Sequence, residues 1–309
     1  MINFYSIDKN EIKETNSWKN GCWINSQSPN EKEKDFLFNK IGMPEAFFND
    51  IKDIDERPRL EQENGWLFVI LRIPIVDNNQ DLPFITVPLG IIFKDNIFIS
   101  ICFHKNEIVS DFLRYSNVKK ISIKNKYELI LRIFISSSVW YSKYLRQINK
   151  IVTLTEDKLE KSIKNEQLQE LFSLEKSLIY FTSTLADHTF LLKRLKVINN
   201  LQEKTPSDLL EDVEIELMQA QTTAQIVFGI LRRSEESYNS IISNNLSKVM
   251  KHLTSISIIL MVPTLIASFY GMNVPNSLEN NPFAFVLLFL VSFVIATVGF
   301  IIFKKIDWF

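Results

Sequence analysis

Small, polar or flexible side chains recur at regular spacing in an otherwise apolar stretch near the C-terminus. They form two columns, each with a period of seven residues. One column is Glu236, Ser243, Met250, Ser257, Thr264 and Gly271, and the other is Ser240, Ser247, Thr254, Met261 and Ser268. A period of seven keeps both columns on one seam of a left-handed supercoil. Neutral oxygen atoms along such a seam suit hydrated Mg²⁺, which dehydrates reluctantly.

This seam has two interpretations. In the first interpretation the seam packs helices together, because small residues let membrane helices approach closely. Alternatively it lines a path for ions, and since two spans cannot enclose a pore, several copies must then close into a ring. Asn273 would offer a side-chain carbonyl at the outer mouth, beside the backbone of Gly271. Met250, Leu253 and Met261 would form apolar rings that close the path by dewetting, with plain core packing as the alternative role.

The elements that position the seam are two apolar runs, residues 253–269 and 283–303. The second run has 21 residues without a charge, and about 20 helical residues cross a bilayer core. The connection between them, residues 271–282, lacks Lys and Arg, whereas Lys304 and Lys305 follow the second run. The positive-inside rule therefore predicts a transmembrane hairpin in the cell membrane with both termini in the cytoplasm.

Composition excludes several classes of protein. Of the Asp, Glu, Lys and Arg side chains, only Glu279, Lys304, Lys305 and Asp307 lie beyond residue 252, which predicts a soluble body before the membrane hairpin. A net charge of −1 without a basic block argues against nucleic acid binding. Two cysteines and three scattered histidines indicate neither a disulfide framework nor a zinc site. No phosphate-binding glycine loop or catalytic triad stands out, so we expect neither an enzyme nor a bound cofactor.

The first 125 residues combine predicted helices and strands into a mixed α/β domain. Turn residues and runs of β-branched or aromatic residues set the bounds. The predicted strands are Trp23-Ile24, Trp66–Ile75, Phe84–Phe93 and Asn96–Phe103, and the predicted helices are Asn30–Ile41 and Pro44–Ile54. We expect turns at Asn78-Asn79 and at Lys94–Asn96.

Long helices are predicted from residue 126 onward, because Leu, Ile, Glu, Lys and Gln dominate and Gly and Pro are scarce. Residues 126–204 form a helical region with helices over Tyr127–Asn165 and Gln167–Asn199. Thr205 and Pro206 then supply a start signal for one stalk helix over residues 205–270. It continues into the first span, at about 253–270, and residues 304–309 form a short tail after the second. The predicted fold is an α+β membrane protein.

Tyr270-Gly271-Met272-Asn273, at the outer end of the first of two C-terminal spans, resembles the signature of the CorA family of magnesium transporters. Further matching positions surround it and extend through most of the chain. They are Asn244, Val249-Met250-Lys251, Leu253-Thr254, Met261, Thr264, Ile266-Ala267, Lys304-Lys305, Trp308 and, more diffusely, Asp55-Glu56-Arg57-Pro58-Arg59 with the sheet after it.

The resemblance implies a homopentameric, channel-like transporter of divalent cations, for Mg²⁺ and also for Co²⁺ or Ni²⁺. It implies a filter of Gly271, Met272 and Asn273, and a polar pore position at Thr264. The hydrophobic constriction of the family matches Met250, Leu253 and Met261. The family also holds inhibitory Mg²⁺ between cytoplasmic domains. Glu236 falls where a stalk carboxylate of that regulatory site is expected. One candidate partner is the acidic group Asp50, Asp53, Asp55 and Glu56. The alternative role of this acidic group is a solvated, charged surface.

Three departures from the family pattern bear on ion selectivity and gating. The loop after the signature carries one carboxylate, Glu279, so it concentrates cations weakly. Ser247 stands where many members carry an asparagine, and the terminal basic cluster is reduced to Lys304 and Lys305. Two alternative functions stay open: a zinc-transporting member of the same superfamily, against which the intact Met272 argues, and a membrane-anchored scaffold or sensor that only oligomerises.

Overall fold

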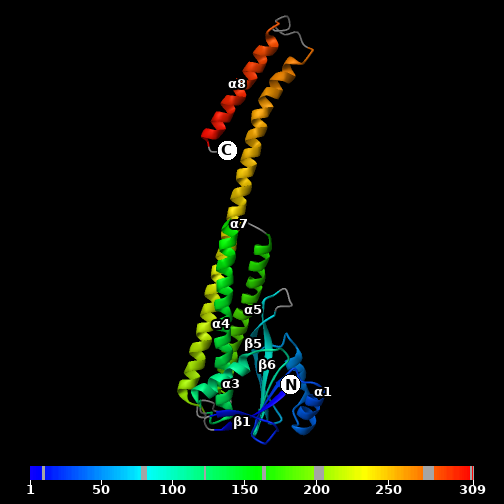
Figure 1. Ribbon diagram of the computed structural model, residues 1–309, viewed down its shortest axis with the longest axis vertical. Helices are drawn as coiled ribbons and strands as arrows, with labels where there is room; N and C mark the ends of the chain where they lie inside the picture. Colours follow the sequence, from blue (N-terminus) through cyan, green and yellow to red (C-terminus); the bar gives the residue numbers. More distant parts are fainter. Residues whose placement is uncertain are drawn as a thin grey trace. The chain divides into compact units, whose positions relative to one another are not determined.

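The computed structural model describes residues 1–8, 11–77, 82–121, 123–161, 165–197, 205–273, 282–306 and 308 (Figure 1). The chain divides into two compact units, Met1–Arg233 and Ser234–Phe309. The predicted turn at Asn78-Asn79 and the residues 274–281 of the predicted loop lie outside the described residues.

Seven strands form one mixed sheet among the described residues of the first unit. Its order is β2-β1-β3-β7-β6-β5-β4, and only β3 and β7 run parallel. The strands are β1 Ile2–Asp8, β2 Glu11–Thr15, β3 Trp23–Gln27, β4 Arg59–Glu63, β5 Trp66–Val76, β6 Phe84–Lys94 and β7 Ile97–Cys102. Because helices cover both faces, β5 and β6 are buried along almost their whole length and read as continuous apolar runs.

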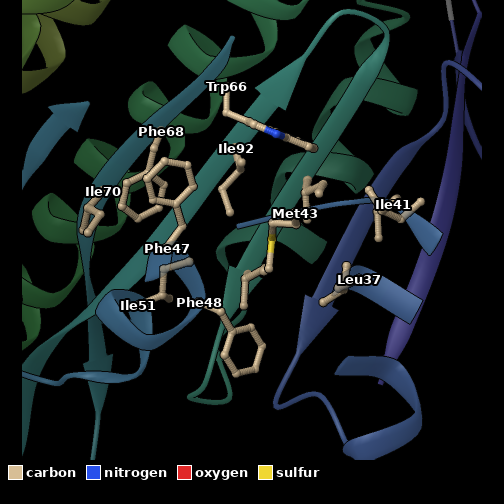
Figure 2. Close-up of a cluster of buried hydrophobic side chains, with 13 residues drawn as sticks. Leu37, Ile41, Met43, Phe47, Phe48, Ile51, Trp66, Phe68, Ile70 and Ile92 are labelled. Carbon is tan, nitrogen blue, oxygen red and sulfur yellow. The ribbon is translucent and has the colours of Figure 1, made fainter. Parts of the chain in front are cut away.

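Short helices cover one face of the sheet: α1 Glu31–Asp35, the π-helix η1 Phe36–Lys40 and α2 Glu45–Lys52. Side chains from η1, α2, the turn between them, and β3, β5, β6 and β7 form a buried apolar cluster, in which Phe47 stacks on Phe68 at 4.4 Å between ring centroids (Figure 2). Gly90 on β6 allows α2 to approach, since a Cβ there would lie 2.2 Å from Ile51 Cδ1. This cluster fixes α2 against the sheet.

The other face packs against α4 Lys126–Lys161 and α5 Asn165–Val197, while α3 Ile108–Lys119 contacts α4 and β2. A buried polar network joins these helices to β5 and β6. The His188 Nε2 accepts from the backbone N–H of Arg72 at 3.1 Å, and the Tyr141 hydroxyl donates to the carbonyl of Arg72 at 2.9 Å. The Arg72 guanidinium donates to the hydroxyl and the carbonyl of Thr86. The network therefore ties α4 and α5 to β5 and β6.

The predicted mixed fold is confirmed, with differences in its elements. The helix expected over Asn30–Ile41 divides into α1 and η1, and the strand at Trp23-Ile24 continues to Gln27. Sequence analysis missed β1, β2, β4 and α3. Polar residues obscured the pattern of the edge strands, and Asn117 on α3 substitutes for a neighbouring strand by bonding both the N–H and the carbonyl of Ile12.

Helix α7, Ser207–Tyr270, begins in the first unit and ends in the second. It starts two residues after the predicted cap at Thr205 and contains Pro263. Helix α8, Ala284–Lys305, follows it. Both helices have the length and apolar composition of membrane spans, and α8 is the more hydrophobic of the two.

Candidate functional site

Helix α7 packs against α8 through one stripe of side chains in the second unit. These residues are the less exposed ones over the last five turns of α7, and they recur every three or four positions, as one face of a helix requires. They are His252, Ser255, Ile259, Val262, Ile266 and Tyr270, and Pro263 beside Val262 is also partly covered. Ser255 is fully buried, and a Cβ on Gly299 of α8 would lie 3.7 Å from Ile259. This stripe is a packing surface.

Helix α8 meets this surface with mostly small residues. Its less exposed positions are Ala284, Leu288, Ser292, Ala296, Gly299 and Phe303. Small residues at four of these six positions let the two helix backbones approach closely, which is the usual basis of packing between membrane helices. The remaining large apolar side chains of α8 are exposed, as a surface facing lipid requires.

The predicted pore residues occupy the opposite side of α7. All of them are exposed in the single chain: Ser247, Met250, Leu253, Thr254, Ser257, Met261, Thr264 and Ser268. Ser257 and Met261 each stand two positions from Ile259, and two helical positions place side chains about 160° apart around the axis. The seam therefore faces away from α8.

The hydroxyl groups of this seam are oriented by their own helix. Ser257 donates to the carbonyl of Leu253 at 2.9 Å, and Thr264 donates to the carbonyl of Leu260 at 2.8 Å. Because each hydroxyl proton is used inside the helix, the oxygen presents lone pairs to its surroundings. Lone pairs on an exposed face can accept from the water of a hydrated cation.

Gly271, Met272 and Asn273 directly follow the last turn of α7 and are all exposed. The N–H of Gly271 donates to the carbonyl of Ala267 at 3.0 Å, which closes the helix end. The C-terminal end of a helix carries a partial negative charge, and the last turn of α7 contains no basic residue to offset it. Asn273 therefore lies at a helix end that favours cations.

The acidic group proposed as a partner for Glu236 is engaged within the first unit. Arg59 forms ion pairs with Glu56 and with Asp50, the latter at 2.7 Å, and Asp53 accepts from the N–H of Asp55. Glu236 is exposed in the second unit. Across the described parts of the chain, no group of three or more His, Cys, Asp or Glu side chains is arranged to hold a metal ion.

Sequence analysis assigned no role to Ser255, whereas the structure gives Ser255 and Ser257 different roles on α7. Ser255 lies in the packing stripe and donates to the carbonyl of Lys251 at 2.8 Å, but Ser257 lies in the exposed seam. The spacing of Ser255 with Ile259, Val262 and Ile266 could have revealed this. The packing face of α8 also went unnoticed, although its small residues are regularly spaced.

Comparisons with known proteins cover both units of the chain. The cobalt/magnesium transport protein CorA of Methanocaldococcus jannaschii is 26% identical over 293 residues, 93% of this chain and 90% of that protein. The protein of the same description from Thermotoga maritima is 25% identical over 275 residues, 87% of this chain and 77% of that protein.

Solved structures show the same fold. The complete structure of the M. jannaschii CorA magnesium transporter superposes with a TM-score of 0.84, covering 100% of this chain and 99% of that chain at 23% identity. The full-length CmaX protein gives a TM-score of 0.72 at 16% identity, covering 99% of this chain and 97% of that chain. The family model described as CorA-like Mg²⁺ transporter protein matches residues 18–305. Since this match includes five strands of the sheet, α7 and α8, the chain belongs to the CorA-like Mg²⁺ transporter family.

Proposed function

We propose that this chain forms a homopentameric, channel-like transporter that carries Mg²⁺, and also Co²⁺ or Ni²⁺, into the cell. The observation that carries the proposal is the exposed polar seam on the face of α7 opposite α8. Membership in a transporter family agrees with the prediction that the chain is not an enzyme, and two curated relatives are named as cobalt/magnesium transport proteins.

The seam needs other copies of the chain. Hydroxyl groups such as those of Ser257 and Thr264 are unfavourable against lipid, and α8 covers only the opposite side of α7. A ring in which each α7 presents its seam to a common axis would enclose a polar path, with the α8 helices outside. Such a ring has heterologous, closing interfaces. Five copies is the number that the family resemblance implies.

An ion would meet Asn273 and the backbone of Gly271 first, with Met272 beside them. Their position at the negative end of α7 supports binding of a hydrated cation. Thr264 and Ser257 would then supply acceptor oxygens, and rings of Met261, Leu253 and Met250 would supply the constriction. The remaining proposed lining residues are Ser268, Thr254 and Ser247.

Entry would be driven by the membrane potential. Moving a divalent cation inward is favoured by about 4.6 kcal/mol per 100 mV, twice the value for one charge. In this arrangement residues 1–125 and the helical region 126–204 lie in the cytoplasm with both termini, residues 271–282 lie outside, and residues 253–270 and 283–303 cross the membrane. Glu236 is then a stalk carboxylate within reach of cytoplasmic Mg²⁺.

Ion uptake into liposomes that contain the purified full-length chain tests the proposal. We expect Mg²⁺ influx that rises with an inside-negative potential and that Co²⁺ and Ni²⁺ compete for. A verified pentamer without flux would establish the scaffold or sensor instead, and Zn²⁺ flux without Mg²⁺ flux would establish the zinc-transporting alternative. Varying Mg²⁺ on the side of the first unit, in the native chain and in Glu236→Gln, tests the regulatory role of Glu236.

A further inference from the structure

The second unit carries four lysines at the end of the hairpin where α7 enters its apolar run and α8 leaves its own. They are Lys248 and Lys251 on α7 and Lys304 and Lys305 in the last turn of α8. All four side chains are exposed, and among the described residues none of them forms an ion pair or a side-chain hydrogen bond. The sequence places one carboxylate near this end, Asp307, against four positive charges. The chain therefore leaves a positive patch here that it does not offset.

The contact between Ile259 and Gly299 sets the levels of these lysines along the two antiparallel helices (Figure 1). Lys305 lies six positions beyond Gly299, so α8 ends about 9 Å past the contact. Lys251 and Lys248 lie eight and eleven positions before Ile259, about 12 Å and about 17 Å from it along α7. The lysines of both helices thus lie within a layer of roughly 8 Å, similar to one headgroup region of a bilayer.

An open step is formed where α8 ends and α7 continues. Lys248 and Ile259 lie only about 20° apart around the axis of α7, so Lys248 is on the face that α8 covers further along, yet it is exposed because α8 ends before this level. The chain turns back after Ile306, the N–H of Trp308 donates to the carbonyl of Phe303 at 3.0 Å, and these two rings stack at 5.5 Å between centroids. The step therefore has a lysine on one side and an aromatic ring on the other.

Helix dipoles account for only two of the four lysines. Lys304 and Lys305 lie in the last turn of α8, where cations offset the partial negative charge of the helix end. Lys248 and Lys251 lie far from either end of the 64-residue α7, so no terminal charge attracts them. The adjoining source of negative charge is lipid, because both helices have the length and composition to cross a membrane directly beside the patch. A tryptophan at the end of a span is likewise typical of the membrane interface.

We propose that the step between α7 and the end of α8 binds the headgroup of an anionic phospholipid. The inference rests on the proposed topology, in which this end of the hairpin meets the cytoplasmic leaflet. Lys248 donates to the phosphate from α7, and the long stems of Lys304 and Lys305 bring their ammonium groups into the same headgroup layer. Trp308 lies against the glycerol and the upper acyl chains. Each lysine near an anionic membrane surface contributes roughly fivefold to binding.

Quenching of tryptophan fluorescence by brominated lipid tests the proposal with the full-length chain in bilayers. Trp308 is the one tryptophan in the sequence of the second unit, and the other four belong to the first: Trp18, Trp23, Trp66 and Trp140. Subtracting the signal of the Trp308→Phe variant isolates the fluorescence of Trp308. The bilayers are phosphatidylcholine with increasing fractions of phosphatidylglycerol, and matched samples carry bromine on the acyl chains of one lipid or of the other.

We expect phosphatidylglycerol to associate next to Trp308 at least about fivefold more tightly than phosphatidylcholine. Combining Lys248→Gln, Lys304→Gln and Lys305→Gln should reduce this preference below about twofold, and the fold should survive because these exposed side chains have no described partner to lose. Arg233→Gln is the matched control. It removes one positive charge from the same helix about 22 Å from Lys248, outside the headgroup layer, so the preference should stay within about 1.5-fold of the native chain.

Equal quenching by the two lipids would overturn the proposal, and so would a preference that persists in the triple variant. Inorganic phosphate, added at constant ionic strength, tests a second source of the same chemistry. The lipid preference should not change, whereas its loss would assign the step to a soluble anion. None of these results touches the transport proposal, which ion flux measures separately. A lipid preference in a chain without Mg²⁺ flux would refute the channel and keep the lipid site.

Discussion

The two units of this chain treat their polar groups in opposite ways. In the first unit the Arg72 side chain on β5 finds its partners within the chain, namely Thr86 and the carbonyls of Ile54 and Glu56. In the second unit the hydroxyls of Ser257 and Thr264 bond only to their own helix and keep their lone pairs exposed.

This difference separates residues that specify the fold from residues that are available for function. A polar group satisfied inside the chain stabilises one arrangement of its neighbours, and its loss leaves a buried partner unpaired. An exposed acceptor contributes little to the stability of the single chain. We therefore expect substitutions in the first unit to lower stability, and substitutions in the seam of α7 to lower flux while leaving the fold intact.

Asn273→Ala should have the largest effect, and it should act on flux alone. Removing the amide carbonyl from every copy of the chain removes the first proposed ligand of the ion, so we expect Mg²⁺ uptake to fall at least about 100-fold. Uptake into liposomes measures the effect, and the elution volume of the detergent-solubilised oligomer should not change. Unchanged uptake would remove Asn273 from the filter.

Gly90→Ala tests the opposite behaviour in the first unit. The new Cβ would lie 2.2 Å from Ile51 Cδ1, and Ile51 is buried and cannot easily yield. We expect a loss of about 3 kcal/mol, seen as a thermal midpoint lower by roughly 6–10 °C. Gly299→Ala on α8 is the matched control, because its Cβ would make an ordinary contact at 3.7 Å with Ile259. Equal effects of the two variants would contradict this account of the close contact.

The buried His188 should make the stability of the first unit depend on pH. Burial, with a smaller contribution from Arg72, lowers the pKa of His188 to about 3, and its Nε2 accepts from the N–H of Arg72 in the neutral form. The unfolded chain binds this proton near pH 6.5, so stability falls as pH decreases from about 6.5 towards 3.

The loss that this histidine causes at pH 5 is about 2 kcal/mol relative to pH 7. Thermal unfolding of the full chain at the two values measures it. His188→Gln removes the titrating group but keeps an acceptor for Arg72, so its midpoint should be lower at pH 7 and vary less with pH. An equal pH dependence in both proteins would assign the effect to other groups.

Thr264→Val should have the smallest effect, and it compares the seam of α7 with the surface of α8 within the second unit. Losing one ring of acceptor oxygens should slow Mg²⁺ uptake about fivefold, because the ion keeps most of its waters. Thr297→Val on α8 is the control, since Thr297 also donates to a helix carbonyl, that of Phe293, but lies outside the seam. If both variants slow uptake equally, the seam of α7 is not the conducting face.

Local patterns were sufficient to predict much of this molecule. The apolar length of residues 283–303 predicts a span because bilayer thickness sets that length, and β5 and β6 were found because buried strands are continuous apolar runs. The Gly-Met-Asn signature and the period of seven predicted the polar seam of α7. Its pore function stays a proposal, because one chain does not show its neighbours.

Tertiary structure decided what depends on contacts between distant residues. The period of seven includes Ser257 and omits Ser255, but the packing of α8 decides that Ser255 is buried while Ser257, two positions later, stays exposed. The parallel pairing of β3 with β7 and the hydrogen bonds of Asn117 to Ile12 on β2 leave no local signal in the sequence. Sequence thus determined the long helices, the buried strands β5 and β6, and which residues share a helix face, because periodicity is local. Which face is covered and which stays open depends on the partner that packs against it.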